Sequence, residues 1–397
     1  MKFRNLPVLC LLLTGFSIAS YGQDSTKAFT FGGSVDTYFH SSFGMRNAYP
    51  GDGDGGPSGS PAPNTSFANL KGFSLGMVNL IASYSGDKVG FTADVVFGPR
   101  GYDAVFGPSY TGQRIVNQLF AYYKFNDAIT LNIGQFNTFL GYEVISPAVN
   151  FHYSTSYMFS WGPFNHTGLR ADFNFGEGWV GKLAVMNPTD IVEFNPTNTY
   201  TAGLQVGKTS DAGGIWLNLL YGDQDGKLDS DTDGNGSTSL GTLFQADITA
   251  GWNVSELFYL GLNATYQTVG EGEQITGGNV QGDNADSHGF YGVALYPKLT
   301  LSETFSLGLR AEYFGMTNNH LGFNGGPIFG TDSEGDGSVM EFTLSGNYKV
   351  GGLTFIPEFR IDKTSEDSFY KKDEIGNLTG PDKTLFPTVN VAAVYKF

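Results

Sequence analysis

The side chains that could carry out catalysis in this chain are five histidines among 38 acidic residues. A nucleophilic site needs a Ser, Thr or Cys beside a base, and a third group must orient that base. His166 begins a predicted strand with no Ser or Cys near it in sequence, and the other histidines fall in predicted loops or at strand ends. No Ser/His/acid set and no pair of catalytic carboxylates can be assembled, so we expect that the protein is not an enzyme. The remaining histidines are His40, His152, His288 and His320.

The segment 141–163 concentrates polar and aromatic side chains between two alternating stretches. Its polar residues are interspersed with hydrophobic anchors and do not cluster at one tip. If the flanking stretches are walls of a barrel, this loop can fold inward, narrow the barrel and set the charge of the opening. The alternative is an external cap that packs on itself. The residues that we assign to a constriction are Glu143, Asn150, His152, Tyr153 and Tyr157.

Charged residues recur on one face of several alternating stretches, because every second residue of a strand points the same way. Unpaired buried charges cost several kcal/mol each, so we expect this face to be wet. Rings of charged side chains select ions in channels, and these residues would then line a pore. The alternative is that they pair across strands and stiffen the wall, and the sequence leaves both open. The set is Arg170, Asp172, Asp247, Arg310, Glu312, Glu341, Glu358 and Arg360.

Metal and cofactor sites are not predicted. The pattern Asp229-x-Asp231-x-Asp233-Gly234 resembles the start of an EF-hand loop, but position twelve is Leu240 and no helices flank it. A solvated acidic loop over 223–241 is favoured, with weak Ca²⁺ binding or cation bridging to lipopolysaccharide left open. The only cysteine is Cys10. No strand–GxGxxG–helix unit is present for a nucleotide cofactor.

The N-terminus has the pattern of a secretory signal peptide over residues 1–22. Lys2 and Arg4 precede a short apolar core, and small residues follow it up to Gly22. Cleavage there would remove Cys10 and leave residues 23–397 as a single domain without thiols, which excludes disulfides and cysteine–metal sites. Removing the two basic residues takes the formal net charge from −16 to −18. This acidic balance excludes nucleic acid as a partner and favours a mild preference for cations.

The composition is typical of a surface that partly faces lipid. Charged residues make up 15% of the chain, against about 25% in soluble proteins, whereas aromatics reach 15% and glycines number 56. No stretch beyond residue 30 has the roughly twenty consecutive apolar residues of a transmembrane helix. A closed barrel is the other structure that satisfies every backbone polar group in a membrane. We therefore expect outer-membrane lipids and lipopolysaccharide as surroundings.

Alternating segments are joined in turn by short turns and by long polar loops, without exception. This rhythm predicts an all-β fold: a transmembrane antiparallel β-barrel of about 16 strands with long extracellular loops and short periplasmic turns. No helix is expected, and Pro357 in the middle of a strand predicts a bulge. A barrel of this size leaves an aqueous channel. Aromatic girdles are expected at Phe125, Trp179, Trp252, Phe305 and Phe397 on one rim, and at Phe39, Phe97, Tyr221, Tyr266 and Tyr313 on the other.

The segment 130–190 also carries a family likeness. Its motifs are the strand Leu131–Phe136, the turn Gly141-Tyr142-Glu143 and the sequence Asn150-Phe151-His152-Tyr153-Ser154. With these motifs the chain resembles the OmpL-like β-barrel porin family of Gram-negative outer membranes. The resemblance implies a passive diffusion channel in the cell outer membrane.

We therefore expect an outer-membrane porin that passes ions and small polar solutes, narrowed by the loop 141–163. The competing class is a surface-exposed binding or adhesion barrel with an occluded lumen, because several long loops could recognise a glycan or a protein. The oligomeric state is not readable from the sequence. The long loops in question are near 40–69, 270–288, 315–337 and 364–385.

Overall fold

In the computed structural model, the described part of the chain comprises residues 28–48, 59–106, 108–109, 112–224, 242–270, 275–276, 279–280, 287–318, 320, 328, 330–372 and 378–397. The predicted signal peptide 1–22 and the aspartates Asp225, Asp229, Asp231 and Asp233 of the acidic loop 223–241 lie outside the described residues.

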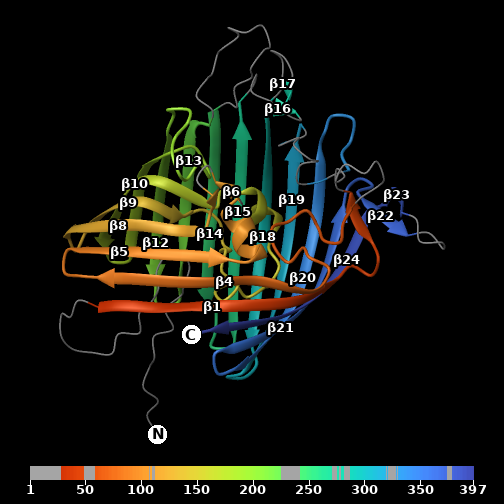
Figure 1. Cartoon of the computed structure of the whole chain (residues 1–397), viewed down its shortest axis with the longest axis horizontal. Coiled ribbons are helices and arrows are strands. Elements are labelled where there is room, and N and C mark those ends of the chain that lie inside the picture. Colours follow the sequence, from red (N-terminus) through yellow and green to blue (C-terminus); the bar gives the residue numbers. More distant parts are fainter. Residues whose placement is uncertain are drawn as a thin grey trace.

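Sixteen strands close into one barrel, and every pairing is antiparallel (Figure 1). Neighbours in the chain are neighbours in the wall, and β1 pairs with β24 to close the ring. The predicted antiparallel barrel of about 16 strands is confirmed. Its strands are β1 (Ala28–Ser41), β4 (Gly72–Ser85), β5 (Val89–Phe97), β8 (Val116–Asn126), β9 (Ile129–Asn137), β10 (Asn165–Gly176), β11 (Trp179–Met186), β12 (Thr201–Ser210), β13 (Gly213–Asp223), β14 (Thr242–Asn253), β15 (Phe258–Val269), β18 (His288–Thr300), β19 (Phe305–Thr317), β20 (Gly337–Val350), β21 (Leu353–Thr364) and β24 (Leu385–Lys396).

Long and short connections alternate around this barrel. The hairpin turns between β4 and β5, β8 and β9, and the later pairs each span only a few residues, and β1 begins beside the first of them, where Ala28 pairs with Ser85. Between β10 and β11, Glu177 and Gly178 both have positive φ, of 50° and 78°. A two-residue type I′ turn requires that conformation, and it matches the twist of the strands. The short turns therefore gather at one end and the long loops at the other.

The long connections contain short elements of their own. Four strands form a small sheet beyond the barrel in the order β23-β22-β2-β3, and two further two-stranded sheets are present (Figure 1). The small sheet consists of β2 (Arg46–Ala48), β3 (Gly59–Ser60), β22 (Phe369–Lys372) and β23 (Leu378–Lys383), and the others of β6 (Pro108–Ser109) with β7 (Gly112–Gln113) and β16 (Ile275–Thr276) with β17 (Asn279–Val280).

The expectation that no helix forms is wrong, because two short helices are present: α1 (Pro99–Ala104) and α2 (Tyr157–Trp161). Ser156 caps α2, since its side chain accepts a hydrogen bond from the N–H of Phe159. Each helix has six residues or fewer, which is too short to produce a 3.6-residue hydrophobic repeat. Within the described residues, no helix is long and apolar enough to cross a membrane.

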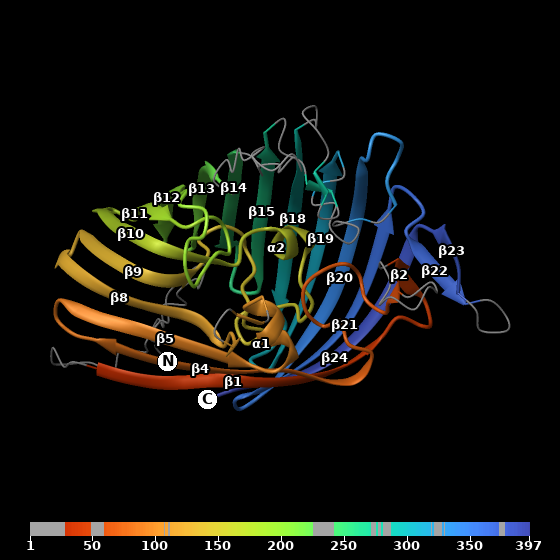
Figure 2. The ribbon, with the colours of Figure 1, turned by 45° about the horizontal axis from the view of Figure 1, so that its top comes forward.

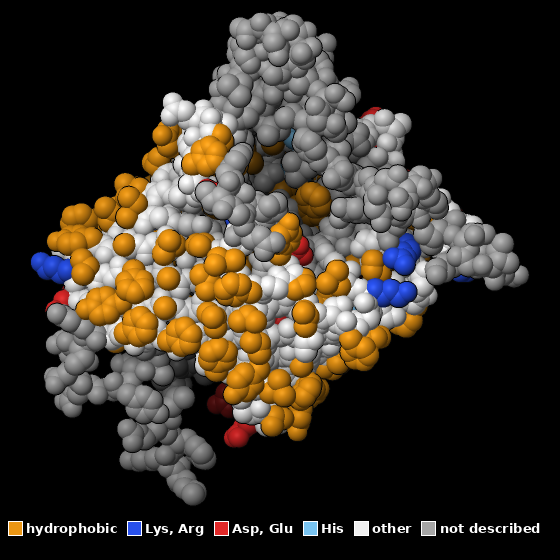
Figure 3. Space-filling model, in the orientation of Figure 1, with side chains coloured by type: hydrophobic (Ala, Val, Ile, Leu, Met, Phe, Trp, Pro, Cys, Tyr) orange, Lys and Arg blue, Asp and Glu red, His pale blue; other side chains and the backbone are white. Residues whose placement is uncertain are grey.

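The two faces of the wall differ in chemistry. Large apolar side chains on the outer face are exposed, and Figure 3 shows them spread over the outside of the strands. On the inner face, polar and charged side chains alternate with them and most are buried. The predicted bulge at Pro357 is absent: β20 and β21 keep one register on both sides of it, from Ser345 opposite Glu358 to Tyr348 opposite Phe355. Gly346 packs opposite the proline ring, so the strand passes without an extra residue.

If the outer face of the barrel contacts lipid, the cost of placing a charge on it should depend on the position along the strand. Leu344 is exposed at the centre of β20, and Tyr348 lies on the same face near the strand end. We expect Leu344→Arg to lower the free energy of unfolding in lipid vesicles by about 2–4 kcal/mol, because a cation there meets hydrocarbon. Tyr348→Arg is the matched control and should cost about 0–1 kcal/mol, since it reaches the interface. Denaturant unfolding followed by tryptophan fluorescence measures both, and equal costs would contradict a membrane centred on Leu344.

Candidate functional site

The connection between β9 and β10, residues 138–164, lies inside the barrel. Figure 2 shows its helix α2 surrounded by the strands of the wall. Its residues form hydrogen bonds with the inner faces of β1, β14, β20 and β21. Segments from two other long connections pack beside it, since Phe67 and Ala104 share a buried apolar cluster with Phe159 and Phe164.

Three arginines donate to consecutive carbonyl oxygens of this loop. Arg100, Arg310 and Arg360 donate in that order to the carbonyl oxygens of residues 153, 154 and 155, at 3.1, 2.8 and 2.7 Å. Arg310 and Arg360 come from the inner faces of β19 and β21, whereas Arg100 comes from α1. Three cations from three elements thus fix one short stretch of backbone.

Three carboxylates accept from the N–H groups of the same stretch. Glu358 accepts from residues 153 and 154 at 2.9 and 3.2 Å, and Glu143 accepts from residue 156 at 2.7 Å. Glu312 accepts from residues 157 and 158, both at 2.8 Å. Hydrogen bonds to ionised groups are roughly twice as strong as neutral ones. We call residues 153–158, with the arginines and carboxylates that hold them, the loop clasp.

The charges of the loop clasp also neutralise one another. Arg310 contacts Glu143 of the loop at 2.7 Å and Glu341 of β20 at 2.9 Å. Arg360 contacts Asp362 at 2.7 Å and lies 3.7 Å from Glu341. Every side chain in this set is less than 6% exposed. Pairing therefore replaces the water that we expected around these groups, because loop atoms satisfy both the cations and the carboxylates.

The loop residues singled out from the sequence all lie in this buried region. Tyr153 donates its hydroxyl to Asp36 of β1 at 2.6 Å, and Tyr157 begins α2. His152 shares a 2.8 Å hydrogen bond with Ser345 of β20. Asn150 instead bonds within the loop, to the N–H and the carbonyl oxygen of Val144.

The wall residues singled out from the sequence divide into two groups. Arg310, Glu312, Glu341, Glu358 and Arg360 reach the inner face as alternation predicts, and the structure places them under the loop. Arg170, Asp172 and Asp247 lie on other strands.

Arg170 lies over the ring of Phe136 and pairs with Asp172 at 2.8 Å, and the carboxylate side of that pair is 31% exposed. Asp247 is 2% exposed and holds the loop by accepting from the N–H of Gly141 at 3.0 Å. Of the eight wall residues, Asp172 is the most open to solvent.

Sequence reasoning missed Asp36, Arg100 and Asp362 as members of this site. Alternation alone places Asp36 and Asp362 on inward faces, and that signal was available. No sequence pattern indicated Arg100, because it lies in an irregular connection. Its Nε donates to the carbonyl oxygen of Ile145, 45 residues later in the chain, at 3.0 Å. Contacts between different long loops have no periodicity in the sequence.

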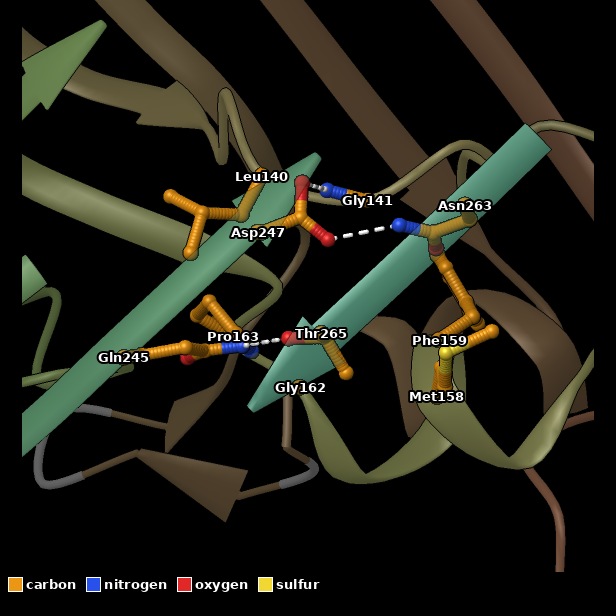
Figure 4. A pocket seen from close by; sticks show the side chains of 10 residues that line it. All are labelled: Leu140, Gly141, Met158, Phe159, Gly162, Pro163, Gln245, Asp247, Asn263 and Thr265. Carbon is orange, nitrogen blue, oxygen red and sulfur yellow. Dashed lines mark hydrogen bonds between the residues drawn. The ribbon is translucent and has the colours of Figure 1, made fainter. Parts of the chain in front are cut away.

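A pocket remains between the loop and the wall strands β14 and β15 (Figure 4). The space enclosed among its lining residues is about 10 Å³, room for about one water molecule, and the pocket opens to solvent on one side. Leu140, Met158 and Phe159 border it from the loop side, and Gln245 and Asn263 are among the polar groups of the wall side. Both oxygens of Asp247 at its edge are occupied by donors, namely Gly141, Asn218, Thr249 and Asn263.

Histidines outside the loop clasp form no metal centre within the described residues, where no cluster of three or more His, Cys, Asp or Glu side chains has suitable geometry. His288 and His320 contact each other through their Nδ1 atoms at 2.8 Å. Burial and then the neighbouring His288 lower the pKa of His320 to about 3, so His320 stays neutral at physiological pH.

Comparisons with known proteins agree with this architecture. The profile of a family described as "Putative beta-barrel porin-2, OmpL-like" matches residues 28–397. The chain belongs to this family. The resemblance inferred from the segment 130–190 is thereby confirmed, and the protein is an outer-membrane porin built as a multi-pass β-barrel. A comparison with curated protein sequences finds no match.

Solved outer-membrane proteins share the fold at low sequence identity. The outer-membrane expressed OmpT of Vibrio cholerae is 12% identical with a TM-score of 0.53, over 95% of this chain and 99% of that one. An anion-selective porin from Comamonas acidovorans is 10% identical with a TM-score of 0.57, over 94% and 100%. Pseudomonas putida OprB is 11% identical with a TM-score of 0.55, over 93% and 94%. These likenesses concern the barrel alone.

His152, which directly precedes the loop clasp, should make the stability of the folded protein depend on pH. Burial, and then the charge of Arg310, lower the pKa of His152 to about 3, while Glu341 opposes and Arg360 reinforces the shift. The unfolded side chain has a pKa of about 6.5 and therefore binds a proton first as the pH falls. The stability that a neutral His152 contributes should therefore be lost as the pH falls from 6.5 to 4.

We expect His152→Gln to abolish that part of the pH dependence while keeping a polar contact to Ser345. Denaturant midpoints at pH 7 and pH 4.5 give the measurement, compared between wild type and variant. The comparison is needed because burial raises the pKa of Asp190 to about 7, which stabilises the protein in acid and opposes the histidine. Identical pH profiles of the two proteins would contradict a buried neutral His152.

Removing Arg310, the central cation of the loop clasp, should lower the free energy of unfolding. Arg310→Met leaves Glu143 and Glu341 buried without their partner, and breaking a buried pair in this way costs about 3–5 kcal/mol. The control is Lys383→Met, which removes an exposed pair with Asp382 and should cost about 0–1 kcal/mol. Denaturant unfolding in detergent micelles compares the two, and a small loss for Arg310→Met would mean that the clasp is not required for stability.

Proposed function

We propose that this porin is a water-filled channel for passive diffusion of ions and small polar solutes, and that the loop 141–163 narrows it. The observation that carries the proposal is the position of this loop, whose backbone is hydrogen-bonded to inward side chains of β19 and β21. A rigid loop across the lumen limits the solute size, because it occupies space that a sixteen-stranded barrel otherwise leaves open.

We place the solute path on the side of the loop that faces β14 and β15, where this pocket lies. On the wall side, the amide of Gln245 donates to the hydroxyl of Thr265, and the amide of Asn263 donates to Asp247. A passing solute would exchange these hydrogen bonds for its own. The loop side of the pocket is apolar. A narrow passage with a few polar groups suits small solutes and does not need to bind them tightly.

The remaining parts of the proposal concern the surroundings of the barrel. Residues 1–22 direct the chain to secretion as a cleaved signal peptide, and residues 23–397 form the single barrel domain. Exposed apolar residues on the outer face, such as Leu183 and Leu217, contact outer-membrane lipids, with lipopolysaccharide at the long-loop side. No chemistry is carried out on the solute.

A surface-binding barrel with an occluded lumen is the second candidate, and one observation favours it. Inward side chains around mid-barrel, including Asn79, Asn218 and Thr249, are at most 3% exposed, so little free lumen remains at that height. Liposome swelling with small sugars separates the two functions. An occluded binding barrel gives no swelling, whereas a diffusion channel admits the sugar.

Shortening the loop tests the constriction. Deletion of residues 148–158 should raise the single-channel conductance in planar bilayers, because it removes the chain that fills the lumen. The control is deletion of the equally long segment 228–238, in the connection between β13 and β14. Circular dichroism verifies that both barrels fold. An unchanged conductance in folded 148–158-deleted protein would exclude the loop from the solute path.

A further inference from the structure

Five lysines lie on the inner face of the barrel near its short-turn end, and none belongs to the loop clasp. They come from five strands distributed around the wall, and each lies within four residues of a strand end at that side. Lys349 and Lys396 are exposed, and the others are half-buried. We call this set the lysine ring: Lys124, Lys182, Lys298, Lys349 and Lys396.

Register places the first two lysines inward. Lys124 pairs with Thr130, two positions from the inward Asn132, whose side chain donates to Asp172 at 2.9 Å. Lys182 lies opposite Asp172, and its Nζ donates to Gln205 at 2.8 Å. Because alternate residues share a face, both lysines point into the lumen.

The other three lysines follow the same alternation. The ammonium of Lys298 lies 5.9 Å from the ring of Phe151, which belongs to the loop inside the barrel. Lys349 lies two residues after Asn347, which donates to the carbonyl oxygen of that same phenylalanine at 2.9 Å. Lys396 lies two residues after the buried, inward Val394.

Few acidic side chains lie on this part of the inner wall. Among the described residues, the acid on the inner face at this height is Asp172, and Arg170 already neutralises it at 2.8 Å. The other inward acids lie further toward the long loops. On the neighbouring strand β21, for example, Glu358 lies four residues beyond Thr354, which pairs with Lys349; this corresponds to about 13 Å of strand. That is more than one Debye length at physiological salt, which is about 8 Å.

The short turns themselves carry acids, and some lie beside the ring: the N–H of Lys349 donates at 2.8 Å to the carbonyl oxygen of Thr304, the residue after Glu303. Asp127 and Glu177 are further examples, and all of these side chains are exposed at the tips of the turns. In bulk solvent a charge is screened within about 8 Å. The lysines instead face a lumen with low-dielectric walls, which focus the field of charges that line them. The full set at the turns is Asp87, Asp127, Glu177, Asp211, Glu256 and Glu303.

We propose that the lysine ring makes the channel selective for small anionic solutes such as those with a single carboxylate or phosphate group. The inference rests on the proposed channel function and names the class of solute that the channel prefers. Positive rings at a pore favour anions. The acidic net charge of the chain predicted the opposite preference, but selectivity follows the charges that border the solute path and not the total.

Reversal potentials in a KCl gradient across planar bilayers test this with chloride and potassium as probes. Wild-type protein should be more permeable to chloride than to potassium, by about threefold or more at 0.1 M salt. The preference should shrink at 1 M, where the Debye length is about 3 Å. The triple variant Lys124→Gln, Lys182→Gln, Lys349→Gln should lose most of it.

The matched control removes three exposed lysines from the long-loop side: Lys363→Gln, Lys371→Gln and Lys383→Gln. It carries the same change in net charge and should keep the anion preference. A conducting wild type that prefers potassium, or a ring variant with unchanged selectivity, would overturn the inference and leave the channel function intact. Absence of any conductance from folded protein would instead overturn the channel function, and this inference with it.

Discussion

Burial of charge inside the barrel is the constraint on which the structure depends. Arg310, Arg360, Glu312 and Glu358 cannot be removed from water without partners, because an unpaired buried ion costs several kcal/mol. The backbone of residues 153–158 supplies those partners, as its carbonyl oxygens accept from arginines and its N–H groups donate to glutamates. The loop and the wall therefore satisfy each other's polar groups.

This mutual requirement divides the lumen into two parts. Toward the long loops, the inner face is covered by the loop 138–164 and by α1, and its charges are paired and buried. Toward the short turns, inward side chains are more open and the charges are mostly lysines. In the proposed channel, a solute would meet an entrance lined by lysines on one side and a narrow passage on the other. Size and sign of charge would then be selected at different heights.

The barrel itself was predictable because its determinants are local. Alternation along strands such as β19 and β20 places one face in lipid, and turn residues such as Gly178 fix where each hairpin reverses. The strand count followed from the rhythm of long and short connections. Two predictions about the backbone were wrong, namely the bulge at Pro357 and the absence of helices, and each concerns only a few residues. Gly346 on the neighbouring strand decides the first detail, and α2 has only five residues, too few for a helical repeat to be recognised.

The sequence by itself determined the class of fold, the inward direction of Arg310, Glu312 and Glu358, and the family likeness around Glu143 and Tyr153. Only the tertiary structure decided what these groups contact. Glu143 and Arg310 are 167 residues apart, and Tyr153 and Asp36 are 117 apart. No periodicity links positions so distant, because their distance depends on the closure of the whole barrel around the loop. Because the barrel closes around the loop, the inward charged side chains pair with loop atoms and hold the loop in place.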